Sequence, residues 1–264
     1  MTRFEHVTST ANPLVRQIRR ALGRGGLTED GCCIAETVHL LEEALRSECE
    51  VRAVLVAESA RPALEKLLER LVSVRVALTP DSVFRSLSTL ESSQGLLALV
   101  RAPAWSLPQL LSGQILLVVL DGIQDPGNAG TILRTAEAFG ASGLVFLKGT
   151  VSPFNPKAVR ASAGSLFRLP FVWGADAQRM MAAFREHGLA VYAATPSGCT
   201  TAAQADFRRP CALIIGSEAR GVSDLLRADA TQVRIPTRRV ESLNAAVATA
   251  ILLYEAWQQR TRSP

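Results

Sequence analysis

The second half of this chain holds three short stretches that decide its fold: NAGTILRTA at residues 128–136, GSEARGVS at residues 216–223 and IPTRRVESLN at residues 235–244. Two of them follow a run of apolar β-forming residues, which is typical of a strand buried on both faces of a parallel sheet. Open α/β sheets bind ligands at the carboxyl ends of such strands. The stretches that follow such strands are therefore candidate ligand-binding loops.

The composition is that of a globular protein. The chain has 264 residues, of which 48% are hydrophobic and 20% charged, enough for two modest domains or one large one. The formal charge is +5, and most of the positive side chains are arginine, which binds phosphate through a planar fork and stacks on bases. This modest excess is compatible with a nucleic-acid partner, although many proteins without one share it.

Cysteine and histidine usage gives no sign of a metal site or a disulfide framework. The five cysteines are odd in number and form no C-x-x-C pair, and the three histidines are scattered. The first ten residues, MTRFEHVTST, lack the apolar run of a signal peptide, and no stretch is long and apolar enough to span a bilayer. We therefore expect a cytoplasmic, reduced protein with no metal and no membrane partner.

The first half predicts a small α/β domain. Strand-like runs at residues 32–35, 51–56, 74–78 and 95–100 alternate with helical patterns at residues 38–45, at residues 62–71 and after Pro80. Prolines at positions 103 and 108 then interrupt the pattern and indicate a linker.

A basic helix is expected to begin at Asn12-Pro13, where a capping side chain precedes a proline at the first helical position. Its apolar face is made by Leu14, Val15, Ile18 and Leu22, and much of the remaining surface by Arg16, Arg19, Arg20 and Arg24. These arginines form either an ordinary solvated face or a face that contacts phosphates. The residues alone favour the solvated face.

The second half repeats the strand pattern at residues 115–120, 144–147, 189–193, 212–215 and 232–235, with helical patterns between most of these runs. A long terminal helix is expected at residues 241–259. The fold class is thus α/β with a parallel sheet.

The glycine-rich turn after the strand at 115–120 does not have the spacing of two common nucleotide-binding motifs. Its glycines are too far apart in the sequence for the G-x-G-x-x-G motif. No Lys-Ser or Lys-Thr follows the second glycine, as a P-loop requires. A nucleotide-dependent enzyme of Rossmann type is therefore disfavoured. What remains is a turn that opens a helix with Asn128 and Arg134 about two turns apart, so that both are expected to border one pocket mouth. A capped helix with one arginine in solvent is the alternative.

The other two stretches also allow a functional and an ordinary interpretation. Gly216 lets backbone approach a ligand closely, and Glu218 follows it at a strand end, although a lone loop glutamate is more often a solvated charge. Ser242 or Glu241 can cap the last helix, with Asn244 in its first turn, and exposed N–H groups there can hold polar ligand groups.

Together the three stretches resemble the motifs of the SpoU/TrmH family of RNA 2′-O-ribose methyltransferases, which belongs to the SPOUT class. The resemblance implies a trefoil-knotted α/β domain that binds S-adenosyl-L-methionine and forms a homodimer. By the resemblance, the methyl donor is contacted by Gly216, Ile235 and Leu243. Positions around the reacting ribose are matched by Asn128, Arg134, Glu218, Ser242 and Asn244.

The third stretch departs from the family pattern. Thr237 stands where the family has methionine, Arg238-Arg239 lies in a loop one residue shorter, and Ala245-Ala246 replaces a Val-Ser pair. These changes predict a reshaped donor loop.

The first half resembles the substrate-binding domain of the same family. The matching residues are Ser9, Asn12-Pro13, Glu36, Glu43-Ala44 and 94–97. The resemblance implies that Arg16, Arg19, Arg20 and Arg24 touch RNA. It also implies an RNA substrate-binding domain at residues 1–101, a linker at 102–113 and a knotted methyltransferase domain at 114–264.

The sequence therefore predicts an S-adenosylmethionine-dependent methyltransferase of a ribose 2′-hydroxyl in ribosomal or transfer RNA. The alternative is a catalytically silent RNA-binding relative that serves in ribosome assembly. Intact polar residues in all three stretches favour the enzyme.

Overall fold

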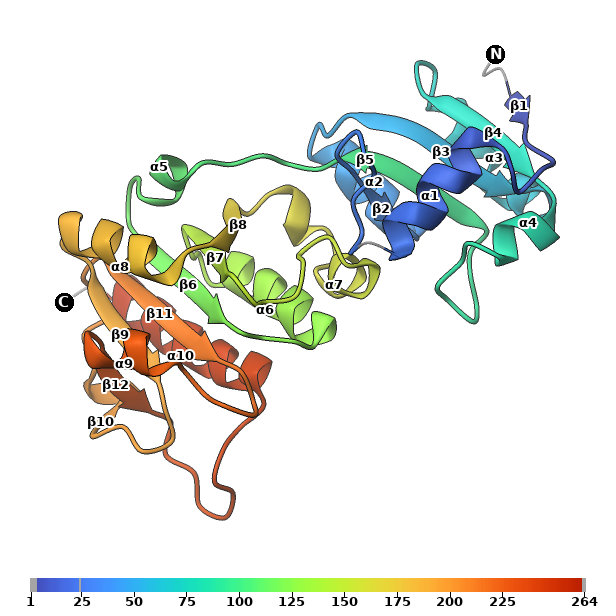
Figure 1. Cartoon of the computed structure of the whole chain (residues 1–264). Coiled ribbons are helices and arrows are strands. Elements are labelled where there is room, and N and C mark those ends of the chain that lie inside the picture. The colour runs from blue at the N-terminus through green and yellow to red at the C-terminus, as the bar shows by residue number, and fades with distance from the viewer. Residues whose placement is uncertain (1–3, 24, 263–264) are drawn as a thin grey trace. The chain divides into compact units, whose positions relative to one another are not determined.

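The computed structural model describes residues 4–23 and 25–262, drawn in Figure 1. The chain divides into two compact units. The first comprises Met1–Pro103 and Phe154–Phe167, and the second comprises Ala104–Pro153 and Arg168–Pro264. The described residues include no helix that is long and apolar enough to cross a membrane.

The first unit is built on a five-stranded sheet in the order β1-β4-β3-β5-β2. Its strands are β1 (Phe4–His6), β2 (Cys32–Ala35), β3 (Val51–Ala57), β4 (Arg75–Thr79) and β5 (Leu96–Arg101). The pairs β1–β4 and β4–β3 are parallel, whereas β5 runs antiparallel to both of its neighbours. The sequence pattern predicted every strand except β1, which has only three residues and no buried alternation.

The α-helices that residues 4–23 and 25–103 contribute to this unit are α1 (Pro13–Gly23), α2 (Val38–Arg46), α3 (Arg61–Glu69) and α4 (Asp81–Arg85). The amphipathic pattern of α1 explains its packing, because Leu14, Val15, Ile18 and Ala21 are buried. The Asn12 side chain accepts a hydrogen bond from the Leu14 N–H at 2.9 Å and so marks the helix start.

A segment from the later part of the chain completes the first unit. It contains α7 (Pro156–Ala161) and a 3-10 turn (Ser165–Phe167), whereas the sequence pattern assigned these residues to the second domain. Phe154 is buried, and its carbonyl lies so close to Gly26 that a Cβ there would sit 1.7 Å from the oxygen. The hydrophobic pattern could not reveal this, because it does not specify which core an apolar segment joins.

A buried polar cluster ties this segment to the first unit. The Glu36 carboxylate is buried and accepts hydrogen bonds from the Ser88 hydroxyl at 2.6 Å and the Thr89 N–H at 2.8 Å. Arg160 of α7 donates to the Thr89 hydroxyl at 2.7 Å and lies 3.5 Å from Glu36. The buried Glu36 carboxylate thereby lies beside a cation from the 154–167 segment.

We expect Arg160→Ala to lower the free energy of unfolding by about 2–4 kcal/mol, because the substitution leaves the Glu36 charge buried without its cation. Urea unfolding monitored by circular dichroism measures the change. Arg52→Ala is the control, since Arg52 pairs with Glu50 at 2.7 Å on the exposed surface and its loss should cost less than about 1 kcal/mol. Equal effects of the two substitutions would contradict a structural role for the cluster.

The second unit has a seven-stranded sheet in the order β10-β12-β9-β11-β6-β7-β8, in which all strands are parallel. Its strands are β6 (Leu116–Asp121), β7 (Gly143–Leu147), β8 (Phe171–Ala175), β9 (Ala190–Ala194), β10 (Thr200–Thr201), β11 (Cys211–Gly216) and β12 (Thr231–Arg234). The central strands β6 and β11 are buried almost throughout, as their apolar runs predict.

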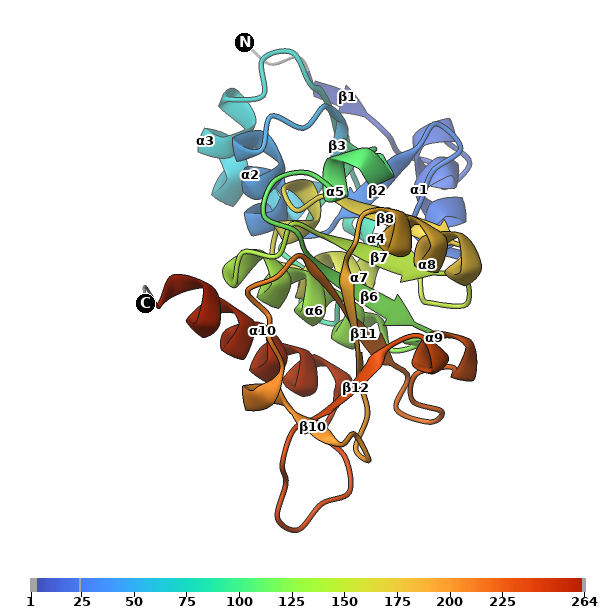
Figure 2. The same ribbon diagram turned by 90° about the vertical axis from the view of Figure 1, so that its left-hand side faces the viewer.

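Helices cover both faces of this sheet, as Figure 2 shows for α6 (Pro126–Ala138) and α10 (Ala245–Thr261) on one side and α8 (Ala177–Glu186) and α9 (Asp224–Ala228) on the other. A further short helix, α5 (Leu107–Leu110), lies inside the segment that the prolines indicated as a linker. Ser106 and Gln109 form a capping box there, which explains why this proline-containing stretch is helical.

The terminal helix α10 is fixed at both ends. Asn244 is its N-cap and accepts hydrogen bonds from the N–H groups of Ala246 at 2.9 Å and Val247 at 3.3 Å. The helix therefore starts four residues later than expected, since Asn244 is the cap and not a residue of the first turn. Near the other end, the Arg260 guanidinium donates to the carbonyls of Phe207, Ile115 and Arg209 at 2.7, 2.9 and 2.8 Å.

Candidate active site

The loops that carry the three stretches leave neighbouring strands of the second sheet. Strands β12, β9, β11 and β6 are adjacent in that order, and Gly216 at the end of β11 lies opposite Asp121 at the end of β6. Because all these strands are parallel, the loops that follow them emerge at the same edge of the sheet.

The loop after β11 folds back tightly on the strand. The Gly221 N–H donates to the Ser217 carbonyl at 2.8 Å, and the Ser223 N–H donates to the Asp121 carboxylate at 2.7 Å. A Cβ on Gly216 would lie 2.0 Å from the Gly221 carbonyl carbon and 2.1 Å from the Val222 nitrogen. Only glycine fits at this position, which gives a structural reason for the first residue of the second stretch.

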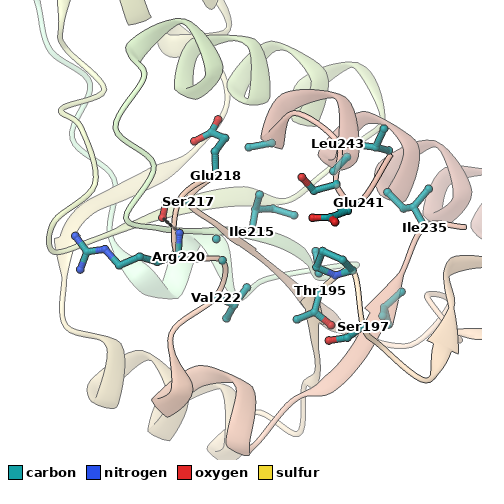
Figure 3. A pocket seen from close by; sticks show the side chains of 18 of the residues that line it. Thr195, Ser197, Ile215, Ser217, Glu218, Arg220, Val222, Ile235, Glu241 and Leu243 are labelled. Atoms are coloured by element: carbon teal, nitrogen blue, oxygen red, sulfur yellow. Dashed lines mark hydrogen bonds between the residues drawn. The ribbon is translucent and has the colours of Figure 1, made fainter. Parts of the chain in front are cut away.

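A cavity of about 420 Å³ opens between these loops (Figure 3). The three residues assigned to the methyl donor, Gly216, Ile235 and Leu243, all line it, as do Glu218 and Ser242. Its apolar wall also includes Ile215 and Val222. The volume and the combination of an apolar wall with polar side chains are typical of a small-molecule site.

A chain of hydrogen bonds joins residues from all three stretches beside this cavity. The Asn128 side-chain amide donates to the Glu218 carboxylate, and the Asn244 amide donates to the Asn128 oxygen at 3.1 Å. Asn128 is held in turn, because its backbone N–H donates to the Asp125 cap of α6 at 2.8 Å. The structure thus brings Asn128, Glu218 and Asn244 together, although 116 residues separate the two asparagines.

Arg134 lies apart from this group. It is exposed on α6 and, within the described part of the chain, it neither lines the cavity nor hydrogen-bonds to the Asn128 group. The expected placement of Asn128 and Arg134 at one pocket mouth is therefore not seen in this chain. Six residues rotate a helix by about 600°, so the two side chains point in directions about 120° apart around the axis.

The arginines of α1 are exposed, and Arg24 lies outside the described residues. Arg19 donates to the Ser86 hydroxyl at 3.2 Å and Arg20 to the Glu29 carboxylate at 3.1 Å, both on the surface. Arg16 and Arg20 border a second cavity of about 610 Å³ in the first unit. Surface pairs of this kind are weak, so these arginines are available to another partner.

Sequence reasoning did not include several polar residues that line this cavity. Thr195 and Ser197 lie in the loop after β9, and Glu241 precedes Ser242. The position of the first two directly after a predicted strand was the signal that could have identified them, because the carboxyl ends of neighbouring parallel strands meet at one edge. In residues 4–23 and 25–262 no group of three or more metal-ligating side chains gathers.

Comparison with known proteins identifies the family of this chain. The model of the SpoU rRNA Methylase family matches residues 115–254, and that of the MRM3-like substrate binding domain matches residues 12–98. The chain is 30% identical to the 23S rRNA (guanosine(2553)-2'-O)-methyltransferase RlmP of Bacillus subtilis, over 95% of this chain and 98% of that protein.

Two solved structures have the same fold over nearly the whole chain. The SpoU methyltransferase AviRb from Streptomyces viridochromogenes in complex with S-adenosylmethionine has a TM-score of 0.83 and 29% identity, covering 94% of this chain and 98% of that one. The S-adenosylmethionine-bound rRNA methyltransferase from Sinorhizobium meliloti also has a TM-score of 0.83 and 29% identity, covering 98% and 99%.

The chain belongs to the SpoU rRNA methylase family. It is an RNA 2′-O-ribose methyltransferase, and its methyl donor is S-adenosylmethionine. This membership supports the enzyme and not the catalytically silent relative. The cavity suits the donor, because its apolar wall can hold the adenine while its hydroxyls and carboxylates can bind the ribose and the positive charges.

Proposed function

We propose that this enzyme methylates a ribose of ribosomal RNA, and that the reacting hydroxyl lies beside the group formed by Asn128, Glu218 and Asn244. The hydrogen-bond chain that joins these three residues at the rim of the donor cavity is the observation that carries the proposal. Because these side chains come from three loops and are hydrogen-bonded to one another, they are well suited to hold a ribose in the orientation that the reaction needs.

The residues of this chain mainly have to align the hydroxyl with the donor, and the hydroxyl proton passes to solvent water as the oxygen–methyl bond forms and the sulfur–methyl bond breaks. S-adenosylmethionine supplies an electrophilic methyl group on a sulfonium, which is already a good leaving group. Asn128 and Asn244 orient the ribose, Glu218 holds Asn128 in place, and Ser242 adds a hydroxyl to the cavity wall. Gly216, Ile235 and Leu243 hold the donor.

We assign Arg134 a role that uses its permanent positive charge and does not require it to accept a proton. A guanidinium stays protonated in almost any protein setting and is therefore a poor base. It can instead bind an RNA phosphate and stabilise the negative charge that develops on the ribose oxygen. Its exposure on α6 leaves it accessible to RNA.

We assign RNA binding to the first unit, through Arg16, Arg19 and Arg20 of α1 and Arg24, and methyl transfer to the second. The match of residues 12–98 to a substrate binding domain supports this division. We further propose that the second unit contains the trefoil knot of the family and that the enzyme works in the cytoplasm, where ribosomal RNA is available.

The choice of RNA is tested by incubating the enzyme and labelled donor separately with unmodified ribosomal RNA and unmodified transfer RNA. We expect label in ribosomal RNA, and Asn128→Ala should remove it. Label in transfer RNA alone would contradict the proposed substrate.

We also propose that the enzyme is a homodimer whose interface includes one face of α10. Val247, Ile251, Tyr254 and Trp257 follow each other at helical spacing and are 49%, 38%, 47% and 42% exposed. A contiguous exposed face of this kind is typical of a contact with another protein. Ala245 and Leu252 of the same helix are buried within this unit and do not belong to the exposed face.

Ile251→Glu is expected to convert the dimer to a monomer at micromolar concentration, because it places a charge in the centre of that face. Light scattering measures the mass. Val72→Glu is the control, since Val72 is 81% exposed in the first unit and should leave the mass unchanged. A wild-type monomer would contradict the proposal.

A further inference from the structure

The charged side chains that line the donor cavity are Glu218, Arg220, Arg227 and Glu241. Two of them have partners of their own, because Glu218 accepts from Asn128 and Arg227 pairs with Asp224. Figure 3 draws the Arg220 guanidinium pointing away from the other lining side chains.

Glu241 differs from these three. Its carboxylate is drawn inside the ring of lining side chains in Figure 3. Within residues 4–23 and 25–262 it has no hydrogen-bond or ion-pair partner, whereas most other charged groups of the cavity are engaged or directed outward. The cavity therefore contains one negative charge that the described chain does not neutralise.

The loop holds this residue in position. The Thr237 hydroxyl donates to the Val240 carbonyl at 2.7 Å and closes a turn, with Arg238 and Arg239 exposed at its tip. Three residues after Glu241, the Asn244 cap fixes the start of α10. The backbone on either side of Glu241 is thus restrained, and its exposed side chain lies at the mouth of the cavity.

The reaction changes the charge of the molecule in the cavity, and the negative charge of Glu241 can respond to that change. S-adenosylmethionine carries a positive charge on sulfur, and methyl transfer leaves a neutral thioether. We propose that Glu241 makes the cavity prefer the charged methyl donor over its neutral demethylated product. The proposal rests on the assignment of this cavity to the donor.

The surroundings strengthen the effect. A charge interaction grows as water is displaced, and a bound donor against Ile215, Val222, Ile235 and Leu243 would displace water from around Glu241. Since the positive charge is lost during transfer, an attraction to it stabilises the bound donor more than the transition state. Glu241 is therefore expected to promote the exchange of product for fresh donor and not the transfer step.

Calorimetry with three ligands tests this. The ligands are S-adenosylmethionine, S-adenosylhomocysteine and sinefungin, in which a carbon bearing an ammonium group replaces the sulfonium. We expect Glu241→Gln to weaken the binding of S-adenosylmethionine and of sinefungin by about fivefold to tenfold. The affinity for S-adenosylhomocysteine should change by less than about twofold. Glu186→Gln is the matched control, because Glu186 ends α8, outside the cavity lining, and should alter none of the three.

Each other outcome has a distinct meaning. Equal weakening of all three ligands would overturn the proposal, because Glu241 would then bind a group that they share, such as a ribose hydroxyl. Unchanged affinities would also overturn it. If the wild-type enzyme bound none of the three, the donor assignment itself would fail. An unchanged unfolding midpoint for Glu241→Gln shows that the variant is folded.

Discussion

Replacing Arg134 with alanine is expected to slow methyl transfer by about a hundredfold to a thousandfold, the usual loss when one group that stabilises transition-state charge is removed. The fold and the donor affinity should be unchanged, because Arg134 is exposed on α6 and lies outside the cavity lining. Lysine should restore little of the rate, since an ammonium cannot reproduce a bidentate guanidinium contact with phosphate. Single-turnover methylation at saturating RNA and donor measures the rate.

Arg185→Ala is the control for this substitution. Arg185 lies in the last turn of α8, at the end of the sheet opposite the active site, and pairs with Asp229 at 3.0 Å on the surface. Its loss should leave the transfer rate within about threefold of wild type, far below the effect that one such group has in the transition state. The same small change for Arg134→Ala would remove Arg134 from the mechanism.

Gly216→Ala is expected to abolish donor binding at millimolar concentration and to destabilise the second unit by more than about 2 kcal/mol. The added Cβ would lie 2.0 Å from the Gly221 carbonyl carbon, and the obstacle is backbone that cannot rotate away as a side chain would. The loop must therefore open, and it carries Glu218 and Val222 of the cavity wall. Calorimetry and thermal unfolding measure the two effects.

Gly23→Ala is the control, because nothing lies within 4 Å of the position a Cβ would take there. We expect it to leave donor binding intact and to change the unfolding midpoint little, because Gly23 is the last residue of α1 and an added Cβ there meets no neighbouring atom. Wild-type donor affinity in Gly216→Ala would show that the loop after β11 does not shape the cavity.

Local patterns predicted the fold well where strands are buried on both faces. The runs that became β6 and β11 are continuous and apolar, so their type and place followed from composition. The pattern missed β8 and β10. The first contains an exposed Trp173 and a glycine, and the second has only two residues, so neither shows a buried apolar run.

The sequence could predict those residues of the candidate site that lie just after a strand. Glu218 lies two residues after β11 and lines the cavity, at the carboxyl strand end where the rule for open α/β sheets predicts ligand contacts. Its contact with Asn128 was not predictable from spacing, because it joins residues 90 positions apart through the order of strands in the sheet. The order of strands is a property of tertiary packing. Tertiary packing also decides that the 154–167 segment joins the first unit, although the sequence pattern assigned it to the second domain.

The central claim is that one site, built from three loops, transfers a methyl group to a ribose oxygen. The most direct test incubates the enzyme with labelled donor and unmodified ribosomal RNA, digests the RNA to nucleosides and identifies the labelled product. The account predicts a single labelled 2′-O-methylnucleoside, absent when Asn128→Ala replaces the wild-type enzyme. Label on a base, or no label in any nucleoside with folded and donor-bound enzyme, would contradict it.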